Sequence, residues 1–227
     1  QISIPSSVTS IEKCAFNECS SLEQIQLSSS LKKINKNCFN KCISLKYISI
    51  PSSVKSIEEG AFNECSSLNE LSFESSSSIK SIGPSSFYKC TSLERITIPS
   101  SLTLIDDNAF ECCNKLNQIN IEKEGSKMTT IGKFAFNKCS SLTEFTIPQS
   151  LRTIKQYAFN KCRLLKQVNL NNSNSIIERN AFTKCTSLTN IELSSIQSIG
   201  QRAFEECISL KKIIFNSPFI IKIRPNI

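Results

Sequence analysis

The sequence contains no histidine and no tryptophan, and only 5 of its 227 residues are glycine. Without an imidazole, the chain cannot build Ser-His-Asp or Cys-His nucleophiles, and histidine-ligated zinc is excluded as well. Neither the GxGxxG nor the GxxxxGK[ST] phosphate-binding pattern occurs. The adjacent acid pairs at 58–59 and 106–107 are expected in turns, where neighbouring side chains do not converge on one substrate atom. These absences predict a protein without enzymatic activity and without a cofactor.

Long apolar stretches and close cysteine pairs are missing too. No segment approaches the ~20 consecutive apolar residues that a membrane-spanning helix needs. No CxxC pair occurs, so a zinc site built from four cysteines has no support and we expect no metal. Hydrophobic residues still make up 39% of the chain, which is enough to build a core, so we expect a folded protein.

Phenylalanine recurs at steps of 22 to 26 residues, and the same frame of residues surrounds each copy. Counted from the phenylalanine, the frame has an aliphatic residue at −8, Ile at −5, a small residue at −1, Cys at +3, Leu at +6 and apolar residues at +9 and +11. Only Ser86 and Asn174 are clearly polar at these positions. The chain is therefore predicted to consist of nine stacked repeats, centred on Phe16, Phe39, Phe62, Phe87, Phe110, Phe136, Phe159, Phe182 and Phe204.

The segment from +6 to +11 reads Leu-x-x-Ile-x-Ile or a close variant. Such alternation predicts a short strand with one buried face. One strand per repeat cannot pair with itself, so stacking is expected to align the strands in a parallel sheet, about 4.8 Å apart. We expect the −8 to −1 segment to cross the opposite face as extended chain with tight turns. Prolines directly follow four of the strands, where a missing amide does no harm, at Pro5, Pro51, Pro99 and Pro148.

This frame, with Ala-Phe-x-x-Cys in phase with Leu-x-x-Ile-x-Ile over the whole chain, resembles the BspA-like class of leucine-rich repeats. That class is found in surface proteins of bacteria and parasitic protists. The resemblance implies one domain over residues 1–227, a mostly β, right-handed curved coil of about nine 22–26-residue repeats with a parallel concave sheet. It also implies adhesion or ligand binding at the cell surface or outside the cell, with a cytoplasmic location as the alternative.

Both ends depart from the frame. Residues 1–7 match residues 47–53, so we expect the array to begin inside a strand and the chain to be a fragment of a longer protein. Residues 216–227 are expected to form a degenerate or truncated terminal repeat. The extra residues of the 25- and 26-residue steps fall at 74–78 and 122–127, directly after strands, so we expect them to bulge from one edge.

Cysteine is abundant, with 12 copies. Cys38 replaces the small residue at −1, and Cys14 and Cys112 fall outside the core positions. Stacked repeats bring the other cysteines to about 5 Å between Cα atoms, within disulfide range, but their odd number and uniform placement favour a ladder of reduced, buried thiols. Disulfides are the alternative. The predicted ladder occupies position +3, at Cys19, Cys42, Cys65, Cys90, Cys113, Cys139, Cys162, Cys185 and Cys207.

The net charge is +8, and lysines concentrate in the turns. The simplest interpretation is a solvated basic back, and contact with anionic glycans or membrane headgroups is a second one. Nucleic acid is disfavoured as a partner because no aromatic series interleaves the basic residues. Position +2 alone holds Lys41, Lys89, Lys138, Lys161 and Lys184.

The exposed positions of the strands are the default binding surface of a curved solenoid. Here they are polar and mildly acidic, and Tyr47 and Arg95 are of the types that dominate protein interfaces. A merely soluble face is the alternative, and the aromatic residues Phe134 and Tyr157 at position −2 form a second candidate contact. The predicted ligand-binding residues are Tyr47, Glu70, Arg95, Gln118, Asn120, Glu144, Gln167, Asn169, Asn190 and Glu192.

The predicted function is that of a non-catalytic recognition or adhesion module, which binds a protein or an extracellular-matrix-type ligand through the concave face. Two alternatives remain open. The chain could be an intracellular scaffold or regulatory subunit that grips a partner protein with the same face, or a spacer that displays another domain.

Overall fold

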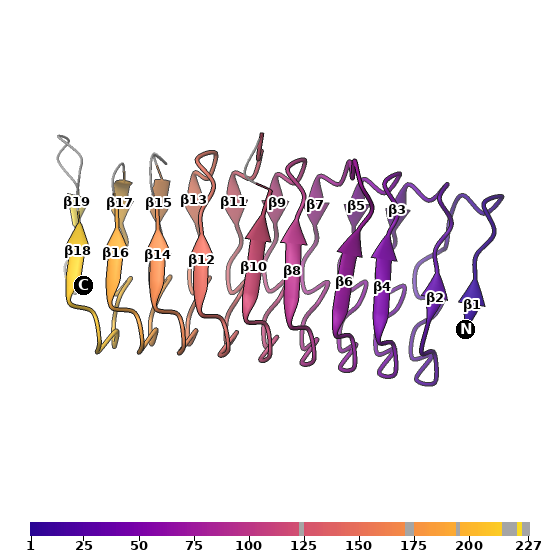
Figure 1. Ribbon diagram of the computed structural model, residues 1–227, viewed down its shortest axis with the longest axis horizontal. Coiled ribbons are helices and arrows are strands. Elements are labelled where there is room, and N and C mark those ends of the chain that lie inside the picture. Colours follow the sequence, from indigo (N-terminus) through magenta and orange to yellow (C-terminus); the bar gives the residue numbers. More distant parts are fainter. Residues whose placement is uncertain (123–124, 171–174, 194–195, 215–221, 224–227) are drawn as a thin grey trace.

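The computed structural model describes residues 1–122, 125–170, 175–193, 196–214 and 222–223. Within these residues the chain forms 19 strands and no helix, wound into a solenoid whose repeats lie side by side from the amino to the carboxyl end (Figure 1). All strand pairs are parallel, which confirms the predicted fold. A parallel ladder fits the sequence because each repeat contributes one strand in the same direction to each sheet.

The predicted strand at +6 to +11 forms an eight-stranded sheet. Ahead of it, β1 (Ile2–Ser3) pairs with β2 (Ile25–Gln26), and a single bridge from Gln24 to Tyr47 joins β2 to the larger sheet. The eight strands are β4 (Tyr47–Ile50), β6 (Glu70–Phe73), β8 (Arg95–Ile98), β10 (Gln118–Ile121), β12 (Glu144–Thr146), β14 (Gln167–Asn169), β16 (Asn190–Glu192) and β18 (Lys212–Ile214).

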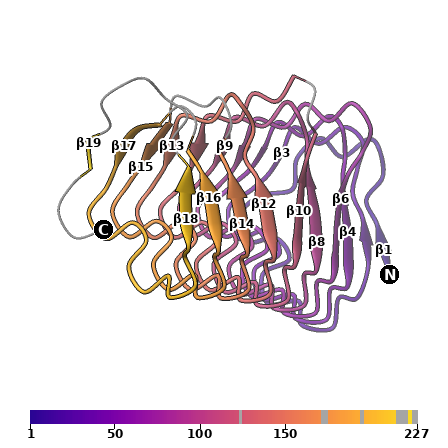
Figure 2. The ribbon, with the colours of Figure 1, turned by 60° about the vertical axis from the view of Figure 1, so that its left-hand side comes forward.

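The opposite face holds a second parallel sheet, where we had expected extended chain and turns without a sheet (Figure 2). Most of its nine strands are only two residues long, and the buried Ile at −5 lies at the end of each strand from β3 to β17. They are β3 (Lys33–Ile34), β5 (Ser56–Ile57), β7 (Ser81–Ile82), β9 (Leu104–Ile105), β11 (Thr130–Ile131), β13 (Thr153–Ile154), β15 (Ser175–Ile177), β17 (Ile196–Ile199) and β19 (Lys222–Ile223).

Between the two sheets, the nine repeat phenylalanines form one column of stacked rings. Neighbouring ring centroids lie 5.1 to 5.6 Å apart, and the planes are within 15° of parallel. Stacking at this spacing adds to the area that each ring buries. Phe16, in the first repeat, is only partly buried, because it has a neighbouring ring on one side alone.

The turn around each phenylalanine has a fixed main-chain conformation. At −2 and +2, φ lies between 52° and 64° in every repeat. This left-handed region suits Gly and Asn, as at Gly60 and Asn37, and is uncommon for other residues. The turn brings main-chain groups of neighbouring repeats together, so that the Phe110 amide donates to the Ala135 carbonyl at 2.8 Å. The turns therefore tie each repeat to the next.

Of the two polar residues at core positions, Ser86 is buried, and its hydroxyl has no hydrogen-bond partner among the described residues. The other, Asn174, lies outside the described residues, as does most of the predicted terminal repeat at 216–227. The insertion at 74–78 forms a turn directly after β6, as expected.

Substitution of Phe110 tests the importance of the column. Its ring is fully buried and stacked on Phe87 and Phe136. Phe110→Ala is expected to lower the free energy of unfolding by about 3–5 kcal/mol, because it leaves a cavity in the middle of the stack. Urea denaturation followed by circular dichroism measures this loss, and an unchanged midpoint would contradict the role of the column.

Candidate functional site

The outward side chains of the eight-stranded sheet form one surface, which we call the strand face. All ten residues predicted to bind a ligand lie on it, and none is buried. The sheet register aligns one of them from each strand in a single row across neighbouring repeats. This row runs through Tyr47, Glu70, Arg95, Gln118, Glu144, Gln167 and Asn190.

The remaining three predicted residues lie two positions further along their strands and so share the same face. Asn120 pairs in register with Thr97, and Asn169 pairs with Glu192. Hydrogen bonds hold two of these side chains, since Gln118 Nε2 donates to Asn120 Oδ1 at 3.1 Å and Gln167 Nε2 donates to Asn169 Oδ1 at 2.9 Å. The structure thus brings the predicted residues together on one face, and their role in ligand binding stays a prediction.

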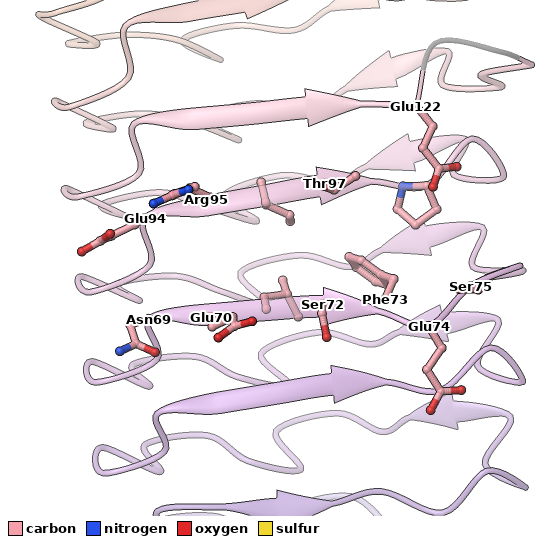
Figure 3. Close-up of a pocket in the computed structure, with 13 residues that line it drawn as sticks. Asn69, Glu70, Ser72, Phe73, Glu74, Ser75, Glu94, Arg95, Thr97 and Glu122 are labelled. Carbon is pink, nitrogen blue, oxygen red and sulfur yellow. The ribbon is translucent and has the colours of Figure 1, made fainter.

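The strand face is hollowed between β6 and β8 (Figure 3). The hollow has a volume of about 710 Å³ and is lined by residues 69–75 from the β6 side, by 94–97 and Pro99 from the β8 side, and by Glu122. Two features of the sequence mark the position of this hollow. The step between Phe62 and Phe87 is two residues longer than the common one, and Phe73 stands where seven of the other eight repeats have Ile or Leu.

The basic turn row at +2 is partly neutralised by acids of neighbouring repeats. Ion pairs join Lys41 to Glu18 at 3.1 Å, Lys89 to Glu64 at 3.1 Å, and Lys184 to Glu206 at 3.2 Å. Among the described residues, no acid forms an ion pair with Lys138 or Lys161. Because the pairs are exposed to solvent, each contributes little to stability.

The second candidate contact, Phe134 and Tyr157, forms a stacked pair with ring centroids 4.9 Å apart. Both side chains are half-buried, and both residues have a positive φ, of 57° and 58°. The Lys133 ammonium lies 5.3 Å from the centre of the Phe134 ring. Packing on a neighbouring turn therefore accounts for much of the surface of these rings, and a ligand contact there stays a prediction.

The cysteines at +3 form a hydrogen-bonded ladder. Each thiol from the second repeat onward lies within bonding distance of the phenylalanine carbonyl of the preceding repeat. Cys42 Sγ lies 3.1 Å from Phe16 O, and Cys113 Sγ lies 3.2 Å from Phe87 O. All 12 cysteines are reduced, and no group of three metal-ligating side chains occurs in the described ranges.

Burial controls the chemistry of the ladder. Loss of solvent raises the pKa of the Cys42 thiol to about 12 and raises the pKa values of Cys90, Cys139 and Cys185 well above the ordinary range. A neutral thiol is a poor nucleophile. The prediction of burial was wrong for Cys19, which is exposed because no preceding repeat covers it. Cys14 is exposed and Cys112 half-buried, as expected for residues outside the core positions.

Comparison with known sequences assigns the family. The BspA type leucine rich repeat region, in 6 copies, matches residues 1–117 and 115–227. The chain belongs to this family. No curated protein matches the chain significantly. Within the described part of this BspA-type repeat protein, no helix is long and apolar enough to cross a membrane.

Solved structures of bacterial leucine-rich repeat proteins share the fold. The pneumococcal vaccine antigen PcpA is 23% identical with a TM-score of 0.59, and the match covers 97% of this chain and 67% of that one. The T. pallidum protein TpLRR is 25% identical with a TM-score of 0.55, over 80% of this chain and 72% of that one. A Bacteroides ovatus protein is 26% identical with a TM-score of 0.52, over 97% and 73%.

Thiol titration tests the ladder of this BspA-type protein. In the native state we expect Cys14 and Cys19 to react at once with a thiol reagent and Cys112 to react more slowly. The other nine should react only in denaturant, because burial blocks access to them and raises the pKa values of eight. A hydrogen bond with Cys185 lowers the pKa of the ninth, Cys207, which burial alone protects. If some cysteines do not react with the reagent in denaturant until a reductant is added, they form disulfides, and the ladder of reduced thiols is wrong.

The same pKa shifts predict a loss of stability in alkali. A folded-state pKa above the unfolded value means that the folded chain holds protons that the unfolded chain releases. The stability that the ladder contributes is therefore complete below the unfolded cysteine pKa and falls as pH rises from about 9 to about 12, the folded pKa of Cys42. Urea midpoints across this range measure the fall. A Cys113→Ala variant is the control, and it should show a shallower pH dependence.

Proposed function

We propose that the chain is a non-catalytic recognition module that binds a protein ligand through the strand face. Leucine-rich repeat proteins are protein-interaction modules as a class, and the family and the structural neighbours support this class here. The observation that carries the proposal is the continuous row from Tyr47 to Asn190. It presents polar, charged and aromatic side chains in register on neighbouring strands, as an extended binding surface requires.

The proposal further places this module at a cell surface, with an extracellular-matrix-type protein as the ligand. Membership of the BspA-type family and similarity to the pneumococcal antigen support this location. The rival is an intracellular scaffold that uses the same surface. The cell-surface module and the intracellular scaffold both predict binding by the strand face. The first experiment therefore tests whether the strand face binds, and the choice of ligands then distinguishes the two hypotheses.

Alanine substitution on the row tests the proposal. Binding of immobilised collagen, laminin and fibronectin, and of heparin as an anionic glycan, is measured by surface plasmon resonance. We expect Arg95→Ala with Glu144→Ala to weaken binding of a matrix protein by about 2 kcal/mol or more, as for central anchors of an interface. Both side chains are exposed, so the variant should fold normally.

The matched experiment neutralises the basic turn row with Lys138→Gln, Lys161→Gln and Lys184→Gln. A ligand held by the strand face should keep its affinity in this variant. Binding that survives the strand-face changes, is lost with the lysines and falls steeply with salt would instead assign the ligand to the basic back, because salt screens exposed charges beyond ~10 Å at about 0.1 M.

A further inference from the structure

The ladder of main-chain hydrogen bonds in the eight-stranded sheet is interrupted between β6 and β8. Four residue pairs join β4 to β6 and four join β8 to β10, but only Glu70 and Arg95 pair across β6 and β8. Elsewhere, the amide at +7 donates to the +7 carbonyl of the preceding repeat, as from Asn69 to Lys46 at 3.0 Å. In the described sheet, the bond from the Glu94 amide to the Asn69 carbonyl is the one missing from this series.

The interruption affects only this face of the solenoid. Behind it, β5, β7 and β9 pair normally, and Phe62 stacks on Phe87 at 5.2 Å. The ring of Phe73 points from β6 towards β8 (Figure 3) and is larger than the Ile or Leu that occupies seven of the eight equivalent positions. The bulk of this ring accounts for the separation of the strands at a site that the rest of the fold holds rigid.

The interruption leaves the Glu94 amide and the Asn69 carbonyl without their usual partners beside the hollow. Leu71 and Ile96 line its floor and are buried, and Phe73 is half-buried and supplies the exposed apolar surface. Unpaired strand edges accept an extended peptide, because the peptide supplies the missing main-chain partners and places alternate side chains in the pocket. The hollow thus offers a place for one apolar side chain of an extended segment.

The rim of the hollow is acidic, although the chain as a whole has a net charge of +8. Its lining holds four glutamates and one arginine, which sum to −3. Glu74 and Glu122 already accept hydrogen bonds from the amides of Ser52 and Ser100. Glu70 and Glu94 are exposed and form no hydrogen bond or ion pair with any described side chain, so both carboxylates are free for a ligand.

Arg95 lies opposite Glu70 in register, yet the two side chains form no ion pair among the described residues. The Arg95 guanidinium therefore keeps its donors, which suit the carbonyl oxygens of a peptide main chain. The acidic excess selects cationic side chains, and the apolar floor selects a hydrophobic one.

We propose that the hollow between β6 and β8 binds an extended segment of a partner protein that carries lysine or arginine next to an apolar side chain. This inference rests on the proposed function, because it assigns to one part of the strand face the chemistry of its ligand. A protein ligand would insert its apolar side chain over Phe73 and pair its cations with Glu70 and Glu94.

The probe is a fluorescent peptide, Gly-Lys-Lys-Phe-Lys-Lys-Gly, measured by fluorescence anisotropy with the full chain at about 50 mM salt, where charge pairs are weakly screened. Two matched peptides replace Phe by Ser, or all Lys by Glu. We expect the Lys-Phe peptide to bind most tightly. Glu70→Gln with Glu94→Gln should weaken it about tenfold, as for removal of anchoring charges. Glu18→Gln with Glu206→Gln removes the same charge in the turns and should leave binding within about twofold.

A second variant tests the opening itself. Phe73→Leu restores the residue type found at this position in other repeats, so we expect it to fold, to bring β6 and β8 together and to slow hydrogen exchange of the Glu94 amide. Peptide binding should fall with it. Unchanged binding with slowed exchange would overturn the proposal, because the opening would then have no part in recognition.

Several outcomes separate this inference from the proposed function. Equal weakening by Glu144→Gln with Glu192→Gln would assign the peptide to the whole strand face and overturn the specific site while keeping the function. Tighter binding of the Glu peptide would show that Arg95 selects acidic ligands and would overturn the proposed chemistry. If the affinity for a matrix protein is unchanged by every strand-face variant, the proposed function itself is wrong.

Discussion

The hydrogen bonding of one carbonyl, that of the repeat phenylalanine, sets the geometry on which the solenoid depends. In the middle of the array, the Phe110 carbonyl accepts the amide of Cys113 in its own repeat and lies 3.2 Å from the Cys139 thiol of the next repeat. Both contacts lie beside stacked aromatic rings and away from water, where hydrogen bonds are strong and their loss is costly. The turn, the ring column and the spacing of both sheets therefore repeat together.

The sequence frame was sufficient to predict the stacked repeats, their buried core and the parallel sheet of the longer strands, because each repeat uses several residues for them. It did not predict the stacking of the phenylalanine rings or the hydrogen bonds to their carbonyls. The second sheet was not predicted, because a two-residue strand such as Ser56–Ile57 is too short to show alternation. Burial of Cys19 was predicted wrongly, since the frame treats every repeat alike and ignores the lack of a neighbour at the first one. The burial of a side chain therefore depends on the place of its repeat in the array as well as on its position within the repeat.

The candidate site, too, was predicted only in part from the repeat frame. The row of exposed residues followed from the alternation of the strands, and the structure places all ten on one face. The opening between β6 and β8 did not follow, because Phe73 fits the frame as one more apolar residue. The combination of a large side chain with the two extra residues that follow the strand distinguishes it from the other repeats. Stability comes from the rings, thiols and second sheet, which continue past the opening, so the strand face can vary without weakening the core.

The charges in the turn row also bear on how the chain folds. Nearly identical repeats can dock out of order, since the rings and thiols of any two repeats match. If the third repeat were looped out, Lys41 would face Lys89 instead of Glu64, and the ion pair between Lys89 and Glu64 would be replaced by repulsion. The ion pairs thus contribute little to the stability of the native array but disfavour misassembled ones. The acidic residues of the turn row therefore favour the correct stacking order of the repeats, which the nearly uniform core does not distinguish from other orders.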